Sequence, residues 1–290
     1  MYDDVLLPFD GSDGAVDVLG HAADLARFVD ATVHVLFVAD TTRDSVTVIE
    51  GETVDVLERR GERVVSEATA ALEARGVDHD ATVRQGNPAP TIVDHAERGG
   101  HDLIVMPTRG RRGLSRHLLG SVSEKVVRHS SVPVLTARTR PDERLAFPYE
   151  GIVVPTDGSV GGDAGVEHGL SLAVTLDATV HALAVVDDAD PLGGVFGTAT
   201  GEDAATAAAN AALDDLVAAA EEYGIERVER HVDHGDPVEA IRERVSADGA
   251  DAVVMGATGG HGDDRVLLGS VAERTVRTTP VPVFTIRDRR

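Results

Sequence analysis

The sequence predicts an α/β fold that is built twice, each copy a mostly parallel five-stranded sheet with helices on both faces. Three observations support this prediction. Short apolar runs typical of buried strands alternate with longer segments of helical pattern. Blocks of sequence recur in the same order at a nearly constant spacing. The length of 290 residues suits two ordinary domains.

In the first copy the predicted elements follow one another in a regular order of strand and helix. Ser12 is expected to cap the first helix, because its hydroxyl can accept a hydrogen bond from a free backbone N–H. The expected strands cover residues 4–9, 31–39, 80–84, 102–106 and 132–137, and the expected helices cover residues 12–29, 52–75, 90–97 and 122–128. In such doubly wound sheets, ligands bind beyond the carboxyl ends of the strands, where the strand order reverses.

The repeat fixes the expected domain boundaries. Asp10 and Asp157 each end a Pro-x-Asp sequence and lie 147 residues apart, whereas Gly120 and Gly269 each open a Gly-Ser-Val sequence and lie 149 residues apart. The five matched blocks begin at Leu7 and Val154, Val33 and Val180, Gln85 and His234, Leu118 and Leu267, and Val132 and Val281. We therefore expect one domain over residues 1–140, a polar linker over 141–150 and a second domain over 151–290.

A glycine-rich loop near the end of the chain is the strongest functional signal. It follows the apolar strand predicted at residues 252–255 and precedes a helix that opens at Gly269. Glycine lacks a Cβ, so the backbone at Gly256 and Gly259 can take left-handed angles and approach a ligand closely. Ser270 adds a hydroxyl beside free N–H groups at a helix N-terminus. These groups form a cradle for phosphates, although plain turn glycines are the alternative explanation.

The spacing Gly-x2-Gly-x9-Gly-Ser differs from both the Walker phosphate loop and the dinucleotide fingerprint. Together with the Pro-x-Asp strand end, the Gly-x-Pro turn and the Val-Pro-Val final strand, it resembles the signature of the universal stress protein family. The repeated blocks make the chain similar to a tandem pair of such domains. The resemblance implies an adenine nucleotide α-hydrolase-like sheet with strand order 3-2-1-4-5.

The resemblance also implies the ligand and the residues that hold it. ATP, ADP or AMP would lie between the first and fourth strands of a copy. In the second copy the implied binding residues are Pro155, Thr156 and Asp157 at the adenosine end, Val185 at the adenine, and Gly256, Gly259, Gly269, Ser270 and Val271 at the phosphates. The matching residues of the first copy are Pro8, Phe9, Asp10, Val38, Gly110, Gly120, Ser121 and Val122. The alternative for Asp10 and Asp157 is a helix cap.

The first copy departs from the glycine spacing at Pro107, where glycine is expected. Proline fixes φ and has no N–H to donate, so one phosphate contact or one backbone conformation would be lost. The arginines 109, 111 and 112 in the same loop either neutralise phosphate or are ordinary solvated side chains. We expect the second copy to bind nucleotide more tightly than the first.

Charge and composition limit the cellular environments and the kinds of binding partner that we expect for the protein. The formal net charge is −23, and Lys125 is the only lysine among 27 basic residues. This balance resembles that of proteins from halophilic archaea. In molar salt the Debye length shortens to about 3 Å, so the repulsion between carboxylates is screened. Such a surface repels nucleic acid and anionic lipid. No apolar run is long enough to span a bilayer and no basic leader precedes the first strand, so we expect a cytoplasmic protein. The sequence contains no cysteine, which excludes thiol chemistry.

Neither a metal site nor a catalytic site is predicted. His34 and His181 recur, but each is expected to stand alone in a strand and to pack there. Any Mg²⁺ is expected to arrive with the nucleotide. The helix-start serines 12, 121, 159 and 270 are explained as caps. The leading hypothesis is a regulatory nucleotide-binding protein; the alternatives are slow ATP hydrolysis used as a switch, and a scaffold that binds no nucleotide.

The last strand of each copy is the expected assembly surface. Residues 132–137 and 281–286 are apolar and each contains a proline, which sheets tolerate at an edge. Unpaired edges invite partners, and members of the resembled family pair these strands between subunits. The duplication predicts an internal pseudo-dimer within one chain and allows a further homodimer.

Overall fold

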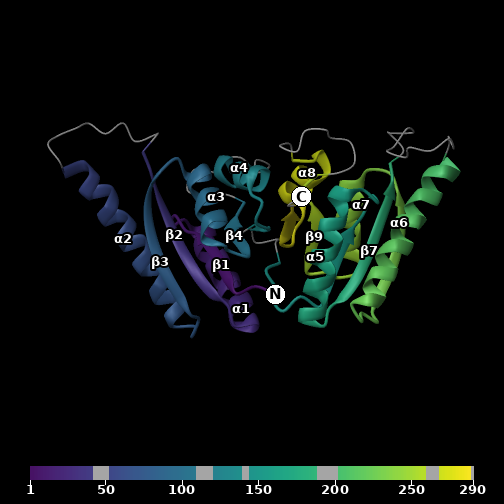
Figure 1. Ribbon diagram of the computed structural model, residues 1–290, viewed down its shortest axis with the longest axis horizontal. Coiled ribbons are helices and arrows are strands. Elements are labelled where there is room, and N and C mark those ends of the chain that lie inside the picture. The colour runs from purple at the N-terminus through teal and green to yellow at the C-terminus, as the bar shows by residue number, and fades with distance from the viewer. Residues whose placement is uncertain (42–51, 109–119, 139–143, 188–201, 259–267, 289–290) are drawn as a thin grey trace. The chain divides into compact units, whose positions relative to one another are not determined.

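The computed structural model describes residues 1–41, 52–108, 120–138, 144–187, 202–258 and 268–288 (Figure 1). The chain divides into two compact units, Met1–Pro141 and Asp142–Arg290. Each unit is an α/β domain whose described strands all pair in parallel, which confirms the predicted fold class.

The first unit contains five strands and four helices among its described residues. They are β1 (Asp4–Pro8), α1 (Asp13–Val29), β2 (Thr32–Asp40), α2 (Glu52–Glu73), β3 (His79–Gly86), α3 (Pro88–Gly99), β4 (Leu103–Pro107), α4 (Ser121–His129) and β5 (Val134–Ala137). The strands lie in the order β3-β2-β1-β4-β5, as predicted.

The second unit repeats this arrangement within its described residues. Its elements are β6 (Gly151–Pro155), α5 (Val160–Leu176), β7 (Thr179–Val186), α6 (Glu202–Glu222), β8 (Val228–His234), α7 (Pro237–Ala247), β9 (Ala252–Gly256), α8 (Ser270–Thr278) and β10 (Val283–Ile286). The order β8-β7-β6-β9-β10 matches that of the first unit.

Each sheet lies between two pairs of helices (Figure 1). In the first unit α1 contacts α2, and α3 contacts α4; in the second unit the corresponding contacts join α5 to α6 and α7 to α8. Because both faces of the sheet are covered, the central strands are continuous apolar runs, and every residue of β4 is buried. The outer strands β3 and β8 consist of half-buried and exposed residues instead.

Serines cap the first helix of each unit. The Ser12 hydroxyl accepts a hydrogen bond from the N–H of Ala15 at 3.3 Å, and that of Ser159 accepts one from the N–H of Gly162 at 3.1 Å. Both contacts serve an N–H of the first helical turn, where amides lack the usual partner four residues earlier, and the N–H of Gly162 also donates to the carbonyl of Ser159 at 2.9 Å. The cap predicted at Ser12 is confirmed, and the equivalent cap holds in the second unit.

Residues 144–150, which were predicted as part of a linker, pack within the second unit. The Arg144 guanidinium donates to the carbonyl oxygens of Val245 at 3.0 Å and Ala250 at 3.2 Å, so it serves a carbonyl in the last turn of α7. The Tyr149 ring is buried and lies edge-on to Phe284, with ring centroids 6.0 Å apart. Burial raises the pKa of the Tyr149 phenol well above its ordinary value, so the ring is uncharged. This segment therefore contributes a buried ring and a helix-end donor to the second unit.

Helix α5 approaches β9 so closely that the contact has no room for a β-carbon. A Cβ at Gly165 would lie 2.6 Å from the carbonyl carbon of Met255 and would overlap the nitrogen of Gly256. A Cβ at Gly256 would overlap the carbonyl oxygen of Gly161. The first unit carries the buried Val18 at the position that matches Gly165. The close backbone approach is therefore specific to the second unit.

Candidate functional site at the carboxyl edge of each sheet

The sheet topology brings the predicted site residues of the second unit to one edge. Strand β6 pairs with β9 through Val153 and Val253, and with β7 on its other side. The carboxyl ends of these three parallel strands therefore lie next to one another. Pro155 ends β6, Val185 lies near the end of β7, and Gly256 ends β9. The first unit places Pro8, Val38 and Pro107 in the same way.

The turn after the first strand of each unit is held by its own polar side chains. Asp157 Oδ1 accepts from the N–H of Ser159 at 3.0 Å and from its hydroxyl at 2.5 Å. The hydroxyl of Thr156 accepts from the N–H of Gly158 at 3.2 Å. In the first unit Asp10 Oδ1 likewise accepts from the N–H of Ser12 at 3.0 Å. Because the helix caps are Ser12 and Ser159, the alternative of Asp10 and Asp157 as caps is wrong; both aspartates shape the turn that precedes the cap.

The backbone N–H and carbonyl of Val185 point toward the β6 side of the sheet, at a level that lies beyond the end of β6. The carbonyl of Leu183 accepts from the N–H of Thr156 at 2.8 Å, so Leu183 faces β6. Since backbone groups two residues apart point to the same side of a strand, Val185 also faces β6, but beyond its last residue, Pro155. In the first unit the carbonyl of Leu36 accepts from the N–H of Phe9 at 2.9 Å, and Val38 lies two residues further on. Both valines could offer an N–H and a carbonyl to a planar ring.

Helix α8 begins without a side-chain cap. The N–H of Gly269 donates to the carbonyl of Ala257 at 2.8 Å, and the carbonyl of Gly269 accepts from Glu273 at 2.9 Å. Gly269 is thus the N-cap residue, and Ser270 and Val271 are the first helical residues. The amides of this first turn have no partner within the helix, and the helix dipole favours an anion in front of them. The expectation that Ser270 caps the helix is wrong, because the hydrogen bonds of Gly269 place the cap one residue earlier.

Helix α4 repeats this arrangement in the first unit. The N–H of Gly120 donates to the carbonyl of Thr108 at 2.7 Å, Gly120 is the N-cap residue, and Ser121 and Val122 begin the helix. Ser121 is therefore not a cap either. The buried hydroxyl of Ser123 donates to the carbonyl of Pro107 at 2.8 Å and ties the helix to the end of β4. Each unit thus presents the uncapped N-terminus of a helix at the carboxyl edge of its sheet.

Gly256 has a packing role that the sequence analysis did not foresee. Its φ is not in the left-handed region, so no special conformation requires a glycine there. Its missing Cβ leaves room for the carbonyl of Gly161 on α5. The signal that could have revealed this contact is the recurrence of Gly161, Gly165 and Gly169 at every fourth position of a helix. Pro107, the counterpart of Gly256, therefore loses no left-handed conformation, although it still lacks an N–H.

A match to a family profile decides the family. The profile described as "Universal stress protein family" matches residues 1–138 and 148–287, which together are most of the chain. The chain belongs to the universal stress protein family. A universal stress protein of Methanocaldococcus jannaschii is 34% identical over 141 residues, which are 48% of this chain and 83% of that relative. A universal stress protein of Mycobacterium tuberculosis is 29% identical over 244 residues, which are 79% of this chain and 78% of that protein.

A solved structure aligns with nearly the whole chain. The crystal structure of a universal stress protein from Archaeoglobus fulgidus aligns with 98% of this chain and with 98% of its own, with a TM-score of 0.75 and 27% identity. The similarity therefore extends over both universal stress protein domains. No helix in the described part of the chain is both long enough and apolar enough to cross a bilayer.

Part of the predicted universal stress protein site lies outside the described residues. Gly110 and Gly259, together with the arginines 109, 111 and 112, fall within residues 109–119 and 259–267. The described remainder is held in place by helix contacts. The Arg274 guanidinium of α8 donates to Asp236 Oδ2 at 2.8 Å, and Asp236 caps α7. This hydrogen bond is the main reason that the pKa of Asp236 is lowered. It joins the first turn of α7 to the second turn of α8.

Three histidines of the first universal stress protein domain form a cluster, so the expectation that His34 stands alone is wrong. His34 Nε2 lies 2.7 Å from Asp4 Oδ1, and His34 Nδ1 lies 3.0 Å from Asp80 Oδ2. The His34 ring is edge-on to His101, with centroids 4.8 Å apart, and His95 lies 5.5 Å from His101. The cluster forms because β1, β2, β3 and the residues around the end of α3 meet near the amino ends of the strands.

This cluster predicts an acid sensitivity of the first domain. Burial, followed by the neighbouring His101, lowers the pKa of His95; burial also lowers that of His101, with His34 acting in the same direction and Asp4 and Asp80 opposing it. The unfolded chain therefore takes up protons at a higher pH than the folded chain does. We expect stability to be constant above about pH 6.5 and to fall as the pH drops below that value toward the folded-state pKa values.

Urea unfolding at a series of pH values tests this expectation. His101→Asn should reduce the loss of stability below about pH 6.5, since it removes one buried group whose protonation opposes folding. His129→Asn, at an exposed position, is the matched control and should leave the slope unchanged. An identical slope in His101→Asn and the wild type would show that the cluster does not drive the acid sensitivity.

Proposed function

We propose that this universal stress protein binds an adenine nucleotide, with ATP as the first candidate, as a regulatory ligand. The observation that carries the proposal is the uncapped N-terminus of α8, whose first amides lie beside the end of β9. Phosphates would accept hydrogen bonds from the amides of Ser270 and Val271, with the loop glycines Gly256, Gly259 and Gly269 around them. Mg²⁺ would arrive with the phosphates.

The nucleoside end fits the rest of the same edge. Val185 would exchange hydrogen bonds with the adenine ring through its N–H and carbonyl, because both face the side on which β6 has ended. The turn formed by Pro155, Thr156 and Asp157 would border the ribose. In the first unit the corresponding residues are Pro8, Phe9, Asp10 and Val38 near the nucleoside, and Gly110, Gly120, Ser121 and Val122 near the phosphates.

We propose that the second unit binds more tightly than the first. The support is the intact Gly-x2-Gly-x9-Gly-Ser spacing of the second copy, against Pro107 in the first copy. Proline removes one amide donor from the strand end that faces the phosphates. Calorimetry of variants altered in one unit at a time would give the order of the two affinities.

The test of the proposed function is a measurement on the full chain. Mass spectrometry of small molecules released from the purified, denatured protein should find an adenine nucleotide, and titration of nucleotide-free protein with Mg-ATP should give saturable heat. An assay of phosphate release separates a bound ligand from a slowly hydrolysed one. A protein that carries no nucleotide and gives no heat with ATP, ADP or AMP would instead be a scaffold.

The setting of the protein is a further part of the proposal. The net charge of −23 and the single lysine support a salt-rich cytoplasm, such as that of a halophilic archaeon. The same charge argues against nucleic acid and anionic membranes as partners. Pairing of β5 with β10 within the chain, and formation of a homodimer, stay predictions. Light scattering in high salt tests the homodimer.

A further inference from the structure

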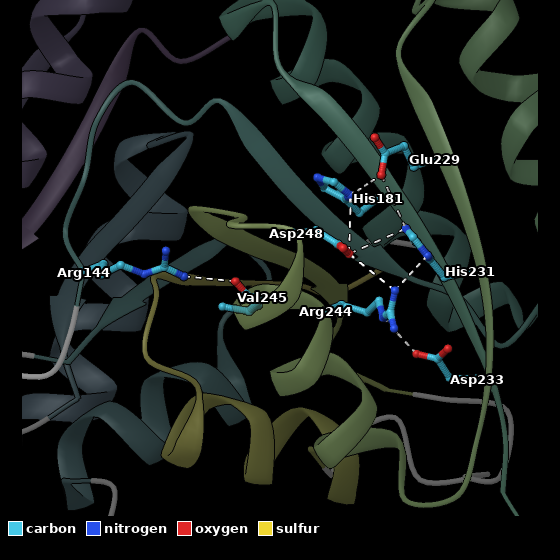
Figure 2. A network of polar contacts seen from close by, with 8 residues as sticks. All are labelled: Arg144, His181, Glu229, His231, Asp233, Arg244, Val245 and Asp248. Carbon is cyan, nitrogen blue, oxygen red and sulfur yellow. Dashed lines mark hydrogen bonds and ion pairs between the residues drawn. The ribbon is translucent and has the colours of Figure 1, made fainter.

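A cluster of two imidazoles and one carboxylate lies toward the amino ends of the strands of the second unit, away from the carboxyl edge described above. His181 comes from the third position of β7, His231 from the middle of β8, and Asp248 from the residue that ends α7. Figure 2 shows the three side chains pointing toward one another. The expectation that His181 stands alone is therefore wrong.

The facing atoms of this cluster are buried and lack hydrogen bonds among the described residues. They are His181 Nδ1, His231 Nε2 and Asp248 Oδ2. Each nitrogen lies 3.7 Å from the same carboxylate oxygen, and all three atoms lie within 4.8 Å of one another. Hydrogen bonds from N–H to oxygen span about 2.7–3.2 Å, so these separations are too long. Buried polar atoms without partners are rare in folded proteins, which indicates that a partner belongs between them.

The separations suit a metal ion better than they suit hydrogen bonds. Zinc binds nitrogen and oxygen ligands at about 2.0–2.2 Å in a tetrahedron, which places its ligand atoms about 3.3–3.6 Å apart. The two 3.7 Å distances would have to contract slightly to reach that geometry, and the separation of the two nitrogens, which is at most 4.8 Å, would have to contract with them. Glu229 Oε2 lies 3.4 Å from His181 Nδ1 and 3.9 Å from His231 Nε2, near the place of a fourth ligand. The Glu229 side chain is largely exposed to solvent.

Carboxylates outnumber basic side chains around the cluster. Glu229, Asp248 and Asp233 face one guanidinium, that of Arg244, whose Nε lies 3.1 Å from Asp233 Oδ2 and whose Nη1 lies 3.7 Å from Asp248 Oδ2 (Figure 2). Burial lowers the pKa of His181, against the opposing effect of Glu229 and Asp248. Arg244 Nη1 donates to His231 Nδ1 at 3.1 Å, so a neutral His231 carries its proton on Nε2. Metal binding would move that proton to Nδ1 and displace the Arg244 contact.

We propose that His181, His231 and Asp248 bind a divalent transition-metal ion, with zinc as the best fit and Glu229 or water in the fourth position. Two imidazole nitrogens select zinc or a similar ion over Mg²⁺ and Ca²⁺, which prefer oxygen ligands. The ion would join β7, β8 and the end of α7. This inference is independent of nucleotide binding at the opposite edge.

The first unit supplies an internal control. His34 matches His181 in the repeat, but both of its ring nitrogens lie within hydrogen-bond distance of carboxylates, at 2.7 and 3.0 Å. Thr82 and Gly99 stand where the repeat places His231 and Asp248. Among the described residues, the first unit therefore lacks the matching ligand set, and we expect one such site per chain.

The test is calorimetric titration of the metal-free full chain with zinc chloride, in phosphate-free buffer with excess magnesium chloride to occupy exposed carboxylates. We expect one tight site per chain. His231→Gln and Asp248→Asn should each weaken binding by at least about tenfold, whereas His34→Gln should leave it unchanged. Cobalt(II) bound in place of zinc should give the intense visible absorption of a tetrahedral ion, and this absorption should be lost in His231→Gln.

Circular dichroism establishes whether each variant is folded. Because two different ligands are substituted, the test still stands if one of the two variants misfolds. Zinc binding of equal strength in the wild type and in both ligand variants would overturn the proposal, because the ion would then sit on the acidic surface. Absence of a saturable zinc site in the wild type under excess magnesium would overturn it as well.

Discussion

Gly165→Ala is expected to destabilise the second unit by about 1–3 kcal/mol or more, which is the usual range for overfilling a packed contact. The new methyl group would meet the carbonyl carbon of Met255 at 2.6 Å and would overlap the nitrogen of Gly256. Both atoms belong to the backbone of β9, which cannot move aside as the end of a side chain can. To accommodate the methyl group, α5 would have to shift away from the strand, and the site at the end of β9 would shift with it.

Gly20→Ala is the matched control for this change. Gly20 also lies within a helix, but the nearest atom to a Cβ there is the end of the Arg75 side chain at 3.6 Å. Alanine should therefore stabilise α1 by about 0.5–1 kcal/mol through its better helix propensity. Urea unfolding of both variants is the measurement. Equal stability of Gly165→Ala and the wild type would mean that α5 and β9 do not pack as closely as described.

Ser270→Pro is expected to weaken ATP binding by roughly tenfold to a hundredfold while the fold is kept. Proline is well tolerated at the first position of a helix, where its missing N–H has no partner within the helix. The preceding Gly269 has φ −59° and ψ 143°, an extended conformation that a following proline accepts. The chain already begins α3 and α7 with Pro88 and Pro237. The variant removes one amide, and a charge-assisted hydrogen bond contributes about 1.5–3 kcal/mol.

Two companion variants make the result specific. Ser270→Ala removes only the hydroxyl, so a smaller effect than that of proline would assign the binding to the amide. Ser121→Pro makes the same change in the first unit, where Gly120 has φ −62° and ψ 138°. If the second unit holds the tighter site, Ser121→Pro should leave the tight binding unchanged in calorimetry. ATP affinity of Ser270→Pro equal to that of the wild type would refute phosphate binding at α8.

The repeat and the alternation of elements were enough to predict the architecture of each unit. Local chemistry decides such features: Ser12 caps a helix because it precedes one, and β4 is buried because residues 103–107 are apolar throughout. Both signals lie within a few residues of the structure that they determine. The strand order was correctly predicted, but it rested on the family resemblance and not on these local signals.

Contacts between distant segments were not predictable in the same way. Asp248 lies near His181 only because α7 packs against β7, and this contact could not be predicted from the sequence of either element. Gly256 was attributed to a ligand although the Gly161 carbonyl occupies the space of its missing Cβ. The identity of the cap, Gly269 and not Ser270, depends on a hydrogen bond to Ala257, from which it is separated by eleven residues in the sequence. In each of these cases the wrong prediction concerned a contact that is determined by tertiary packing.

The position of Arg144 and Tyr149 determines where the later repeat can be separated from the earlier one. A fragment that starts at Gly151 would leave the carbonyls of Val245 and Ala250 without their guanidinium donor and would remove the buried Tyr149 ring from its contact with Phe284. Low stability of such a fragment would then reflect the position of the cut and not an intrinsically unstable domain. For production of the later repeat by itself, the cut belongs upstream of Arg144.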